Sequence, residues 1–210
     1  MNKLLIVIVA VVALASGVFV FKSTSTVAQP EFSLYYQTPR AIKPFELTDH
    51  QGQVFNNQSL AGKWSWVFFG YTSCPDVCPT TLQELNFYYD DIKNVTANSQ
   101  VLLVSVDPNR DTPEKLAQYI AYFNSEFIAL TAGHGAFFPF ARNLGLMYAI
   151  ADDTSKESYL VDHSASMVLI NPEGNIAAIF KPEQALGQVP AIDGEKLVSD
   201  FEKIVTLYNN

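Results

Sequence analysis

The residues most able to do chemistry in this chain are its two cysteines. Cys74 and Cys78 form a C-x-x-x-C pair within the run FGYTSCPDVCP, residues 69–79. The i, i+4 spacing places both sulfurs on one face if the segment is helical, or on one side of a loop if it is not. Their Cα atoms would then lie about 6 Å apart, which allows a disulfide or one shared metal ion.

A cysteine pair of this kind supports redox chemistry, metal binding or a structural crosslink. The thiolate is the form that attacks disulfides and binds metals, and N–H groups at a helix start favour it. In an oxidising compartment two such thiols form a disulfide. An inert structural disulfide is the weakest interpretation, because closing so short a loop stabilises little. A redox pair and a metal site remain.

The elements around the cysteines are predicted to alternate between strands and helices. Residues 64–70 and 101–106 are continuous apolar runs, typical of strands buried on both faces. A helix is predicted after Pro79. Another begins at Thr112-Pro113, an N-cap followed by proline at the first helical position. Residues 136–146 are predicted to be helical, with Pro139 in the first turn or at a kink.

Two hairpins and a closing helix complete the order. The hairpins pair residues 45–48 with 53–55 and residues 166–170 with 175–180, and residues 195–208 form an amphipathic helix. This order is that of a thioredoxin-like fold, an α/β domain with a central mixed sheet flanked by helices. We expect this domain to span residues 42–210, without internal repeats.

A third residue separates a redox pair from a metal site, and His163 is the candidate. It immediately precedes the strand at 166–170, a junction that faces the cysteine loop in a thioredoxin-like fold. Thiol oxidoreductases of this fold usually carry a proline there, which this chain lacks. Two thiolates and an imidazole suit a soft, copper-type ion, whereas zinc would require a fourth ligand. A histidine before a strand can equally be a structural residue, so the residues alone leave both interpretations open.

Three blocks of this sequence resemble the Sco/SenC family of copper-binding cytochrome oxidase assembly proteins. They are FGYTxCPDVCPTTL at 69–82, VDPxRDTPE at 106–114 and VDHS at 161–164. With the predicted turn at 49–52, the resemblance covers about residues 42–182, together with the N-terminal anchor. These blocks are far more specific than a bare C-x-x-x-C pair.

The resemblance implies a thioredoxin-like fold with a family-specific insertion. It also implies that copper is held at the positions that match here as Cys74, Cys78 and His163. The domain would face the periplasm and help to metallate the dinuclear copper site of oxidase subunit II. Two departures concern the residues after His163, where the family often has an aromatic, and the segment 133–139, which lacks the usual polar helix start. Both could alter partner docking or copper exposure, but neither removes a ligand.

Two functions are consistent with these residues. The first is a copper metallochaperone that assists assembly of the copper site in cytochrome c oxidase subunit II. The alternative is a periplasmic thiol–disulfide oxidoreductase that reduces the copper-site cysteines of that subunit, with one cysteine attacking and the other resolving. Either function requires a thiol reductant, and the first also requires a copper donor. A peroxidase is disfavoured, because the arginine nearest in sequence, Arg110, lies far along the chain from Cys78.

Composition limits the classes of partner. The 210 residues are 49% hydrophobic, enough for a real core, and include 13 Lys+Arg against 21 Asp+Glu. Residues 1–22 hold only Lys3 and Lys22, so the rest of the chain holds 11 basic and 21 acidic residues, a net charge of −10. Nucleic acid is excluded as a partner, because phosphate contacts need clustered Lys and Arg. Basic partners or cations suit such a domain.

The N-terminus predicts where the protein is located. Residues 1–22 contain an 18-residue apolar run from Leu4 to Phe21, which as a helix is about 27 Å long, near the thickness of a bilayer core. Residues 13–15 resemble a cleavage site, but the apolar run continues beyond them, which favours an uncleaved single-span anchor over a signal peptide. Residues 23–41 are predicted to be a flexible tether. We expect a bacterial inner-membrane protein with its domain in the periplasm.

The remaining histidines and methionines are predicted to have ordinary roles. His50 lies in a predicted turn and His134 in a Gly-flanked loop, and we expect both to be solvated rather than metal ligands. Met147 and Met167 fall on apolar patterns and are predicted to lie in the core.

The acidic residues near the motifs are predicted to serve local structure. Asp107 and Asp111 suit a turn and a helix start. Asp162 has two suitable roles: its carboxylate can orient the imidazole of His163, or it can form a hydrogen bond at the end of a strand. A further acidic stretch is predicted to be a solvated loop edge that could attract a copper-loaded donor, and it contains Asp152, Asp153 and Glu157.

Overall fold

The computed structural model describes residues 2–24, 28–150, 152, 154, 158–184, 187 and 189–210. Its strands are β1 (Ser33–Ala41), β2 (Glu46–Asp49), β3 (Val54–Asn56), β4 (Trp64–Gly70), β5 (Ser99–Ser105), β6 (Ile128–Thr131), β7 (Tyr148–Ala149), β8 (Asp162–His163), β9 (Met167–Ile170) and β10 (Asn175–Phe180). Its helices are α1 (Lys3–Thr24), α2 (Asn57–Leu60), α3 (Val77–Phe87), α4 (Tyr89–Val95), α5 (Pro113–Phe123), α6 (His134–Leu144) and α7 (Gly194–Tyr208).

Eight of these strands form one mixed sheet in the order β1-β10-β9-β4-β5-β6-β2-β3, and β7 pairs with β8 separately. At its centre β4 runs parallel to β5 and antiparallel to β9. Every residue of β4 and of β5 is buried, as their continuous apolar runs predict. The predicted α/β class with a central mixed sheet flanked by helices is confirmed.

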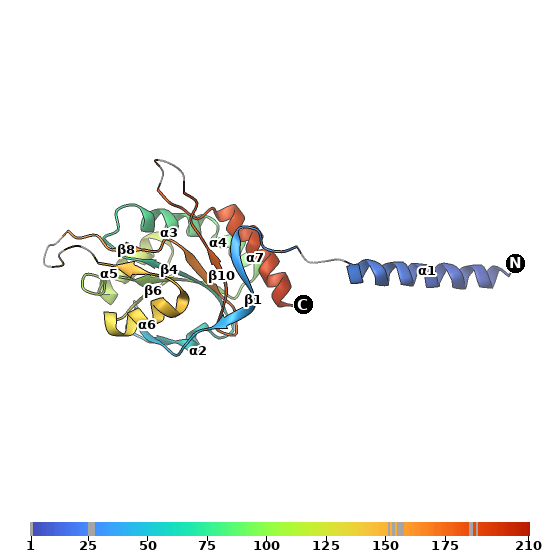
Figure 1. Cartoon of the computed structure of the whole chain (residues 1–210), viewed down its shortest axis with the longest axis horizontal. Helices are drawn as coiled ribbons and strands as arrows, with labels where there is room; N and C mark the ends of the chain where they lie inside the picture. Colours follow the sequence, from blue (N-terminus) through green and yellow to red (C-terminus); the bar gives the residue numbers. More distant parts are fainter. Residues whose placement is uncertain are drawn as a thin grey trace.

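Helices cover both faces of this sheet (Figure 1). Side chains of β4 alternate between the faces. The ring of Trp66 lies 5.0 Å from that of Phe201 in α7, whereas the ring of Phe69 lies 5.0 Å from that of Phe137 in α6. The two helices therefore pack on opposite faces of the sheet, and the cysteine segment begins where β4 ends.

The predicted tether of residues 23–41 is wrong over its second half. Ser33–Ala41 forms β1, which pairs antiparallel with β10, so the folded domain begins before residue 42. The strand is an edge strand whose register shifts between Tyr35 and Arg40, and Pro39 lies inside that irregular stretch. Edge strands and bulges tolerate proline, which explains why the prolines there do not prevent pairing. Residues 25–27 of the predicted tether lie outside the described residues.

The N-terminal apolar run lies in α1, a helix of 22 residues. Within the part of the chain that the structure describes, no helix combines the length and the apolar character needed to cross a membrane.

A buried carboxylate attaches the start of β1 to the closing helix. Asp200 of α7 is fully buried, and its carboxylate accepts the N–H groups of Glu31, Phe32 and Ser33, each at 2.8 Å. The Ser33 hydroxyl donates to it as well, also at 2.8 Å. The chain that enters the domain is thus fixed to α7 before it joins the sheet.

Replacing Asp200 by alanine is expected to lower the free energy of unfolding by about 3 kcal/mol, because it leaves buried N–H donors without their charged acceptor. Urea unfolding of the purified chain measures the change. The matched control is Glu202→Ala, an exposed position on the same helix, for which we expect a change within about 0.5 kcal/mol. Equal effects of the two substitutions would show that the carboxylate does not hold β1.

Candidate metal centre

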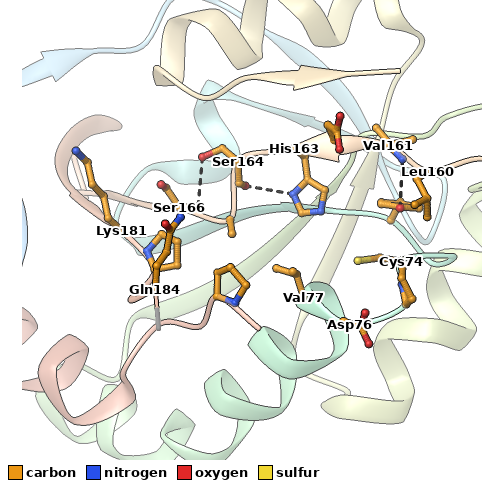
Figure 2. A pocket seen from close by; sticks show the side chains of 16 residues that line it. Cys74, Asp76, Val77, Leu160, Val161, His163, Ser164, Ser166, Lys181 and Gln184 are labelled. Atoms are coloured by element: carbon orange, nitrogen blue, oxygen red, sulfur yellow. Dashed lines mark hydrogen bonds between the residues drawn. The ribbon is translucent and has the colours of Figure 1, made fainter. Parts of the chain in front are cut away.

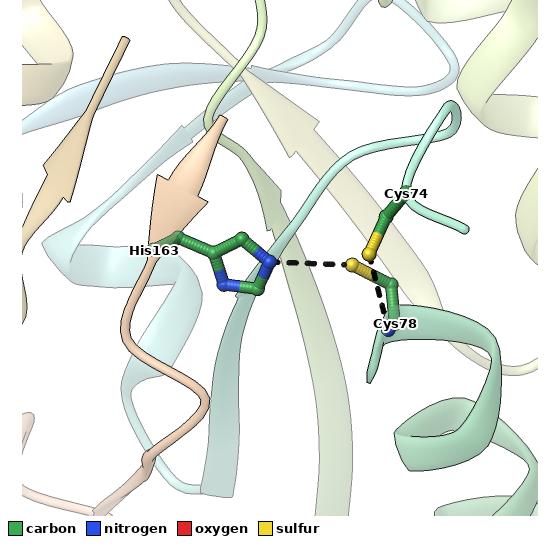
Figure 3. A group of neighbouring side chains, drawn as sticks. All are labelled: Cys74, Cys78 and His163. Carbon is green, nitrogen blue, oxygen red and sulfur yellow. Dashed lines mark hydrogen bonds between the residues drawn. The ribbon is translucent and has the colours of Figure 1, made fainter. Parts of the chain in front are cut away.

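Cys74, Cys78 and His163 converge at the end of β4 (Figure 3). Their ligand atoms all lie within 4.8 Å of one another. The Nε2 atom of His163 is 3.4 Å from Sγ of Cys78, and Sγ of Cys74 accepts the Cys78 N–H at 3.4 Å. The structure therefore brings together all three residues that the sequence singled out, although His163 lies 85 residues beyond Cys78.

The start of α3 positions the two sulfurs. The Cys74 N–H donates to the Tyr71 carbonyl at 3.2 Å, which turns the chain back toward the sheet. Helix α3 begins at Val77, three residues before the predicted start, and its N-cap residue Asp76 makes no side-chain cap bond. Sγ of Cys74 instead accepts an N–H of the first turn, that of Cys78. A sulfur thus takes the place of the usual capping oxygen, and this holds it beside the second sulfur.

Glycine at the end of β4 makes room for the pair. A Cβ atom on Gly70 would lie 2.9 Å from Cδ1 of Leu103 and 3.1 Å from Sγ of Cys78. The first distance is shorter than real Cβ atoms show and the second is tighter than nine in ten, so a larger residue would force Leu103 to move and would press on the buried sulfur. The Cys78 side chain packs directly against the strand backbone as a result.

The two thiols differ in their protonation. The hydrogen bond from the Cys78 thiol, opposed in part by burial and assisted by a weaker hydrogen bond with His163, lowers the pKa of Cys74 to about 4. Burial raises the pKa of Cys78 far above its ordinary value, and its hydrogen bond to Cys74 acts in the same direction. At neutral pH Cys74 is therefore a thiolate, while the buried Cys78 keeps its proton.

The orientation of His163 leaves Nε2 available to a metal ion. The backbone of His163 in β8 pairs with that of Tyr148 in β7. The imidazole ring packs edge-on against the ring of Tyr71, with centroids 5.9 Å apart. Nδ1 lies 3.2 Å from the carbonyl oxygen of Ser164. Since a carbonyl can only accept, Nδ1 donates to Ser164, and Nε2 is the ring nitrogen that faces the sulfurs. Asp162 is exposed, and the partner of Nδ1 is Ser164, so of the two roles considered for Asp162 the orientation of the ring is excluded.

Asp111 fixes the loop between β4 and the cysteines. Its buried carboxylate accepts the N–H and the hydroxyl of Thr72, at 3.1 and 2.6 Å, and the hydroxyl of Ser105 at 2.7 Å. Asp107 is buried too, and Thr112 caps α5 instead. Asp107 serves the predicted turn, because its carbonyl accepts the Arg110 and Asp111 N–H groups, but the predicted helix-start role is wrong for Asp111, whose carboxylate holds Thr72 and Ser105.

A groove of about 810 Å³ opens beside the centre (Figure 2). One wall is formed by residues 74–77 and the other by residues 160–166, and Lys181 and Gln184 lie at one end. Cys74 and His163 line the groove, whereas Cys78 is fully buried behind them. A molecule that enters the groove therefore meets the Cys74 sulfur and the imidazole first.

The other two histidines do not lie in solvent as predicted. Nδ1 of His50 accepts the Ala129 N–H at 3.1 Å, which ties the β2–β3 turn to β6. Nδ1 of His134 lies 3.0 Å from the Tyr148 hydroxyl, and the two rings stack. Both side chains are half-buried, and neither belongs to the metal-ligand cluster found among the described residues.

Of the two methionines predicted to lie in the core, Met167 is buried and Met147 is 79% exposed. Met147 follows the turn at Gly145, and its carbonyl accepts the Ser164 N–H at 2.9 Å. In the acidic stretch, the Asp152 carboxylate accepts the Leu160 N–H at 3.0 Å. Asp153 and Glu157 lie outside the described residues.

Because its pKa is about 4, Cys74 is expected to react with iodoacetamide at a rate that stays nearly constant between pH 5.5 and 8. An ordinary cysteine reacts about tenfold faster for each pH unit in this range, since its thiolate fraction rises toward a pKa near 8.5. Mass spectrometry of the modified chain gives the rate at each site, and we expect Cys78 to stay unmodified. Cys74→Ser is the control. A tenfold rise per pH unit at Cys74 in the folded chain would contradict the lowered pKa.

The sequence of this chain is similar to that of known proteins. The family model described as SCO1/SenC matches residues 35–192. An SCO2-like protein of Rickettsia prowazekii is 33% identical over 180 residues, which cover 84% of this chain and 88% of the relative.

Solved structures of proteins with bound copper share the fold of this chain. The crystal structure of Arabidopsis thaliana ScoI with copper bound is 30% identical and superimposes with a TM-score of 0.70, covering 79% of this chain and 98% of that one. Yeast Sco1 with copper bound is 26% identical, with a TM-score of 0.68 and coverages of 80% and 90%. The fold that positions Cys74, Cys78 and His163 is therefore shared with proteins that hold copper.

Proposed function

The chain belongs to the SCO1/SenC family, and from that premise we propose that it is a copper metallochaperone. It binds one copper ion through Cys74, Cys78 and His163 and assists assembly of the dinuclear copper site of cytochrome c oxidase subunit II. The observation that carries the proposal is the convergence of two sulfurs and one imidazole nitrogen within 4.8 Å at the edge of an open groove.

The donor set fits copper better than other common metals. Two thiolates and one imidazole are soft to intermediate ligands, which favour copper(I), whereas structural zinc sites are closed by four protein ligands. Cys74 is already a thiolate at neutral pH, so of the two cysteines only Cys78 has a proton that metal binding must displace, and Nε2 of His163 faces the sulfurs. The copper-bound structures of the Arabidopsis and yeast relatives support this choice.

The groove suits transfer of the ion. A three-ligand site leaves one side of the metal open, and the groove brings an incoming ligand to the side of Cys74 and His163. An acceptor thiol can then replace these ligands one at a time, while Cys78, buried behind them, releases the ion last.

The location and partners form part of the same proposal. The protein is held in the bacterial inner membrane with its domain in the periplasm, where a copper donor loads it and a thiol reductant keeps its cysteines reduced. The apolar run of residues 4–21 supports this location. Cell fractionation followed by protease treatment of spheroplasts tests it, because a periplasmic domain is digested while the cells stay intact.

The central experiment is transfer to the proposed acceptor. The reduced full chain, loaded with one equivalent of copper, is mixed with the copper-free soluble domain of an oxidase subunit II. We expect the absorption and electron paramagnetic resonance signals of the dinuclear copper site to develop, and a chain carrying Cys78→Ser to be inactive. If the acceptor remains copper-free while the loaded chain keeps its ion, the metallochaperone proposal is wrong.

A second function is favoured by the unequal thiols. Cys74 is a thiolate on the groove and Cys78 is protonated behind it, the arrangement of an attacking and a resolving cysteine. Attack by the Cys74 thiolate on a target disulfide would form a mixed disulfide and release one target thiolate. Cys78 would then lose its proton and attack Sγ of Cys74, which forms the Cys74–Cys78 disulfide and releases the second target thiol.

The same acceptor domain separates the two functions. Its copper-site cysteines are first oxidised to a disulfide, and the reduced, copper-free chain is then added. Two new thiols per acceptor, formed at a rate that depends on Cys74, identify a thiol–disulfide oxidoreductase. Copper transfer without thiol formation identifies a metallochaperone alone.

A further inference from the structure

The segment that carries His163 is attached to the core by a tyrosine four residues earlier. Tyr159 is 3% exposed, and its hydroxyl donates to Oδ1 of Asp107 at 2.5 Å. Asp107 follows β5, and its N–H donates to the Ser105 hydroxyl at 3.1 Å. The acceptor is therefore itself held at the end of a central strand, on the side of the sheet where the cysteine loop begins.

Arg110 completes this attachment. Its Nε pairs with Oδ2 of Asp107, and its guanidinium group lies over the Tyr159 ring, 3.5 Å from the ring centroid. One arginine thus neutralises the buried carboxylate and packs on the tyrosine that the carboxylate binds. A buried charge pair with such contacts has a single favourable arrangement, so the tyrosine is held firmly in position.

A second contact joins the same segment to the cysteine loop. The Val161 N–H donates to the Tyr71 hydroxyl at 3.2 Å. Tyr71 also packs its ring against His163, and its carbonyl accepts the Cys74 N–H. Among the described residues, β8 forms two residue pairs with β7, and the Ser164 N–H donates to the Met147 carbonyl at 2.9 Å. The contacts of Tyr159 and Val161 hold the backbone immediately before His163.

We propose that Tyr159, bound to the Asp107–Arg110 pair, is a positioning residue for the metal centre. It fixes the backbone that carries His163 at the distance from the cysteine pair at which Nε2 reaches a metal ion held by the sulfurs. The inference rests on the proposed copper-binding function and adds to it the residues that preorganise the third ligand. Contacts of this outer kind change metal affinity by about 10- to 100-fold in other metal sites.

The test is a double-mutant cycle on copper(I) affinity, measured by competition with a chelator on the reduced full chain. Tyr159→Phe removes the hydroxyl and keeps the ring that packs on Arg110. We expect it to weaken binding about tenfold when His163 is present and to have no effect in a His163→Ala background. A role in general stability would lower both affinities alike. The matched control is Tyr89→Phe, another buried tyrosine whose hydroxyl bonds a carboxylate, that of Glu126 at 3.1 Å.

A second measurement does not depend on copper. In the reduced, metal-free chain, the imidazole resonances of His163 report its surroundings by NMR. We expect one sharp set in the wild type and in Tyr89→Phe, and shifted or exchange-broadened signals in Tyr159→Phe. Tyr71→Phe, which removes the acceptor of the Val161 N–H, should act in the same direction and replaces Tyr159→Phe if that variant does not fold.

The outcomes separate this inference from the proposed function. Wild-type affinity and wild-type His163 resonances in Tyr159→Phe overturn the positioning role while copper binding stands. Equal losses with and without His163 also overturn it. If the wild-type chain binds no copper, the proposed function fails, and the His163 resonances alone then decide whether Tyr159 positions the ring.

Discussion

The substitution His163→Ala is expected to abolish tight copper binding while leaving thiol–disulfide exchange largely intact. Nε2 is the only nitrogen among the three ligand atoms that converge within 4.8 Å, and its loss leaves two sulfurs. Outer contacts of metal ligands are worth about 10- to 100-fold in affinity, so the loss of a ligand itself should cost at least about 100-fold. Competition with a copper(I) chelator on the reduced chain measures the loss.

Thiol–disulfide exchange should be affected far less than copper binding in this variant, because no atom of His163 takes part in the exchange reaction. The largest cause of the lowered pKa of Cys74 is the hydrogen bond from Cys78, and His163 contributes less. The Cys74 thiolate therefore persists without the imidazole, and the rate with a model disulfide should change only a few-fold. His134→Ala is the control, because it removes a half-buried histidine that lies outside the centre. Copper affinity that is the same in wild type and His163→Ala would eliminate the three-ligand site and favour the reductase.

Local patterns were sufficient to predict the elements that carry the cysteines. The apolar run of β4 has no polar face, which is possible only for a strand covered on both sides. The Thr112-Pro113 start of α5 is confirmed, and the Thr112 hydroxyl accepts the Lys115 N–H at 3.3 Å. Such signals are read from a few neighbouring residues, so the sequence contains all the information they need.

Features that depend on distant partners were not predicted. Strand β1 has no regular alternation and exists because β10 offers it an edge. The exposure of Met147 depends on how the chain leaves α6 at Gly145, where the backbone adopts a φ of 79°. His50 is half-buried because β6 lies beside its turn. For β1 and for His50 the deciding contact comes from a segment far along the chain, and local periodicity carries no trace of it.

The metal centre shows the same division. His163 could be proposed because it stands immediately before a hairpin strand, but the residues alone left its role open. Asp107 and Tyr159, which hold its segment, are 52 residues apart and were interpreted separately or not at all. A weak signal was present in the sequence: an aspartate and an arginine in a turn after a buried strand are candidates for a buried pair. Their tyrosine partner could be found only from the fold.

Oxidation of the chain to the Cys74–Cys78 disulfide is expected to reduce its copper stoichiometry from one to zero. The two thiols are free and adjacent in the structure, and a bond between the sulfurs would consume both thiolates that the metal requires. His163 alone cannot hold the ion. Copper analysis of the oxidised chain after gel filtration measures the stoichiometry, and reduction with dithiothreitol followed by removal of the reductant should restore one copper per chain. An oxidised chain that still holds one copper would show that the ion is bound elsewhere.

Copper is expected in turn to raise the midpoint potential of the Cys74–Cys78 pair by an amount that can be calculated. Copper binds only the reduced chain. By linkage, its binding free energy stabilises the dithiol form relative to the disulfide form by the same amount. At a free copper concentration of 100 times the Kd, the reduced form gains a factor of about 100, which raises the midpoint potential of the pair by about 60 mV. A redox titration with and without copper, in a buffer whose thiols do not chelate the ion, measures this shift. Cys74 is a thiolate and therefore open to oxidation, so a chain without copper needs a reductant that a loaded chain does not. An unchanged midpoint potential would show that copper and the disulfide do not compete, and that the two functions use different sites.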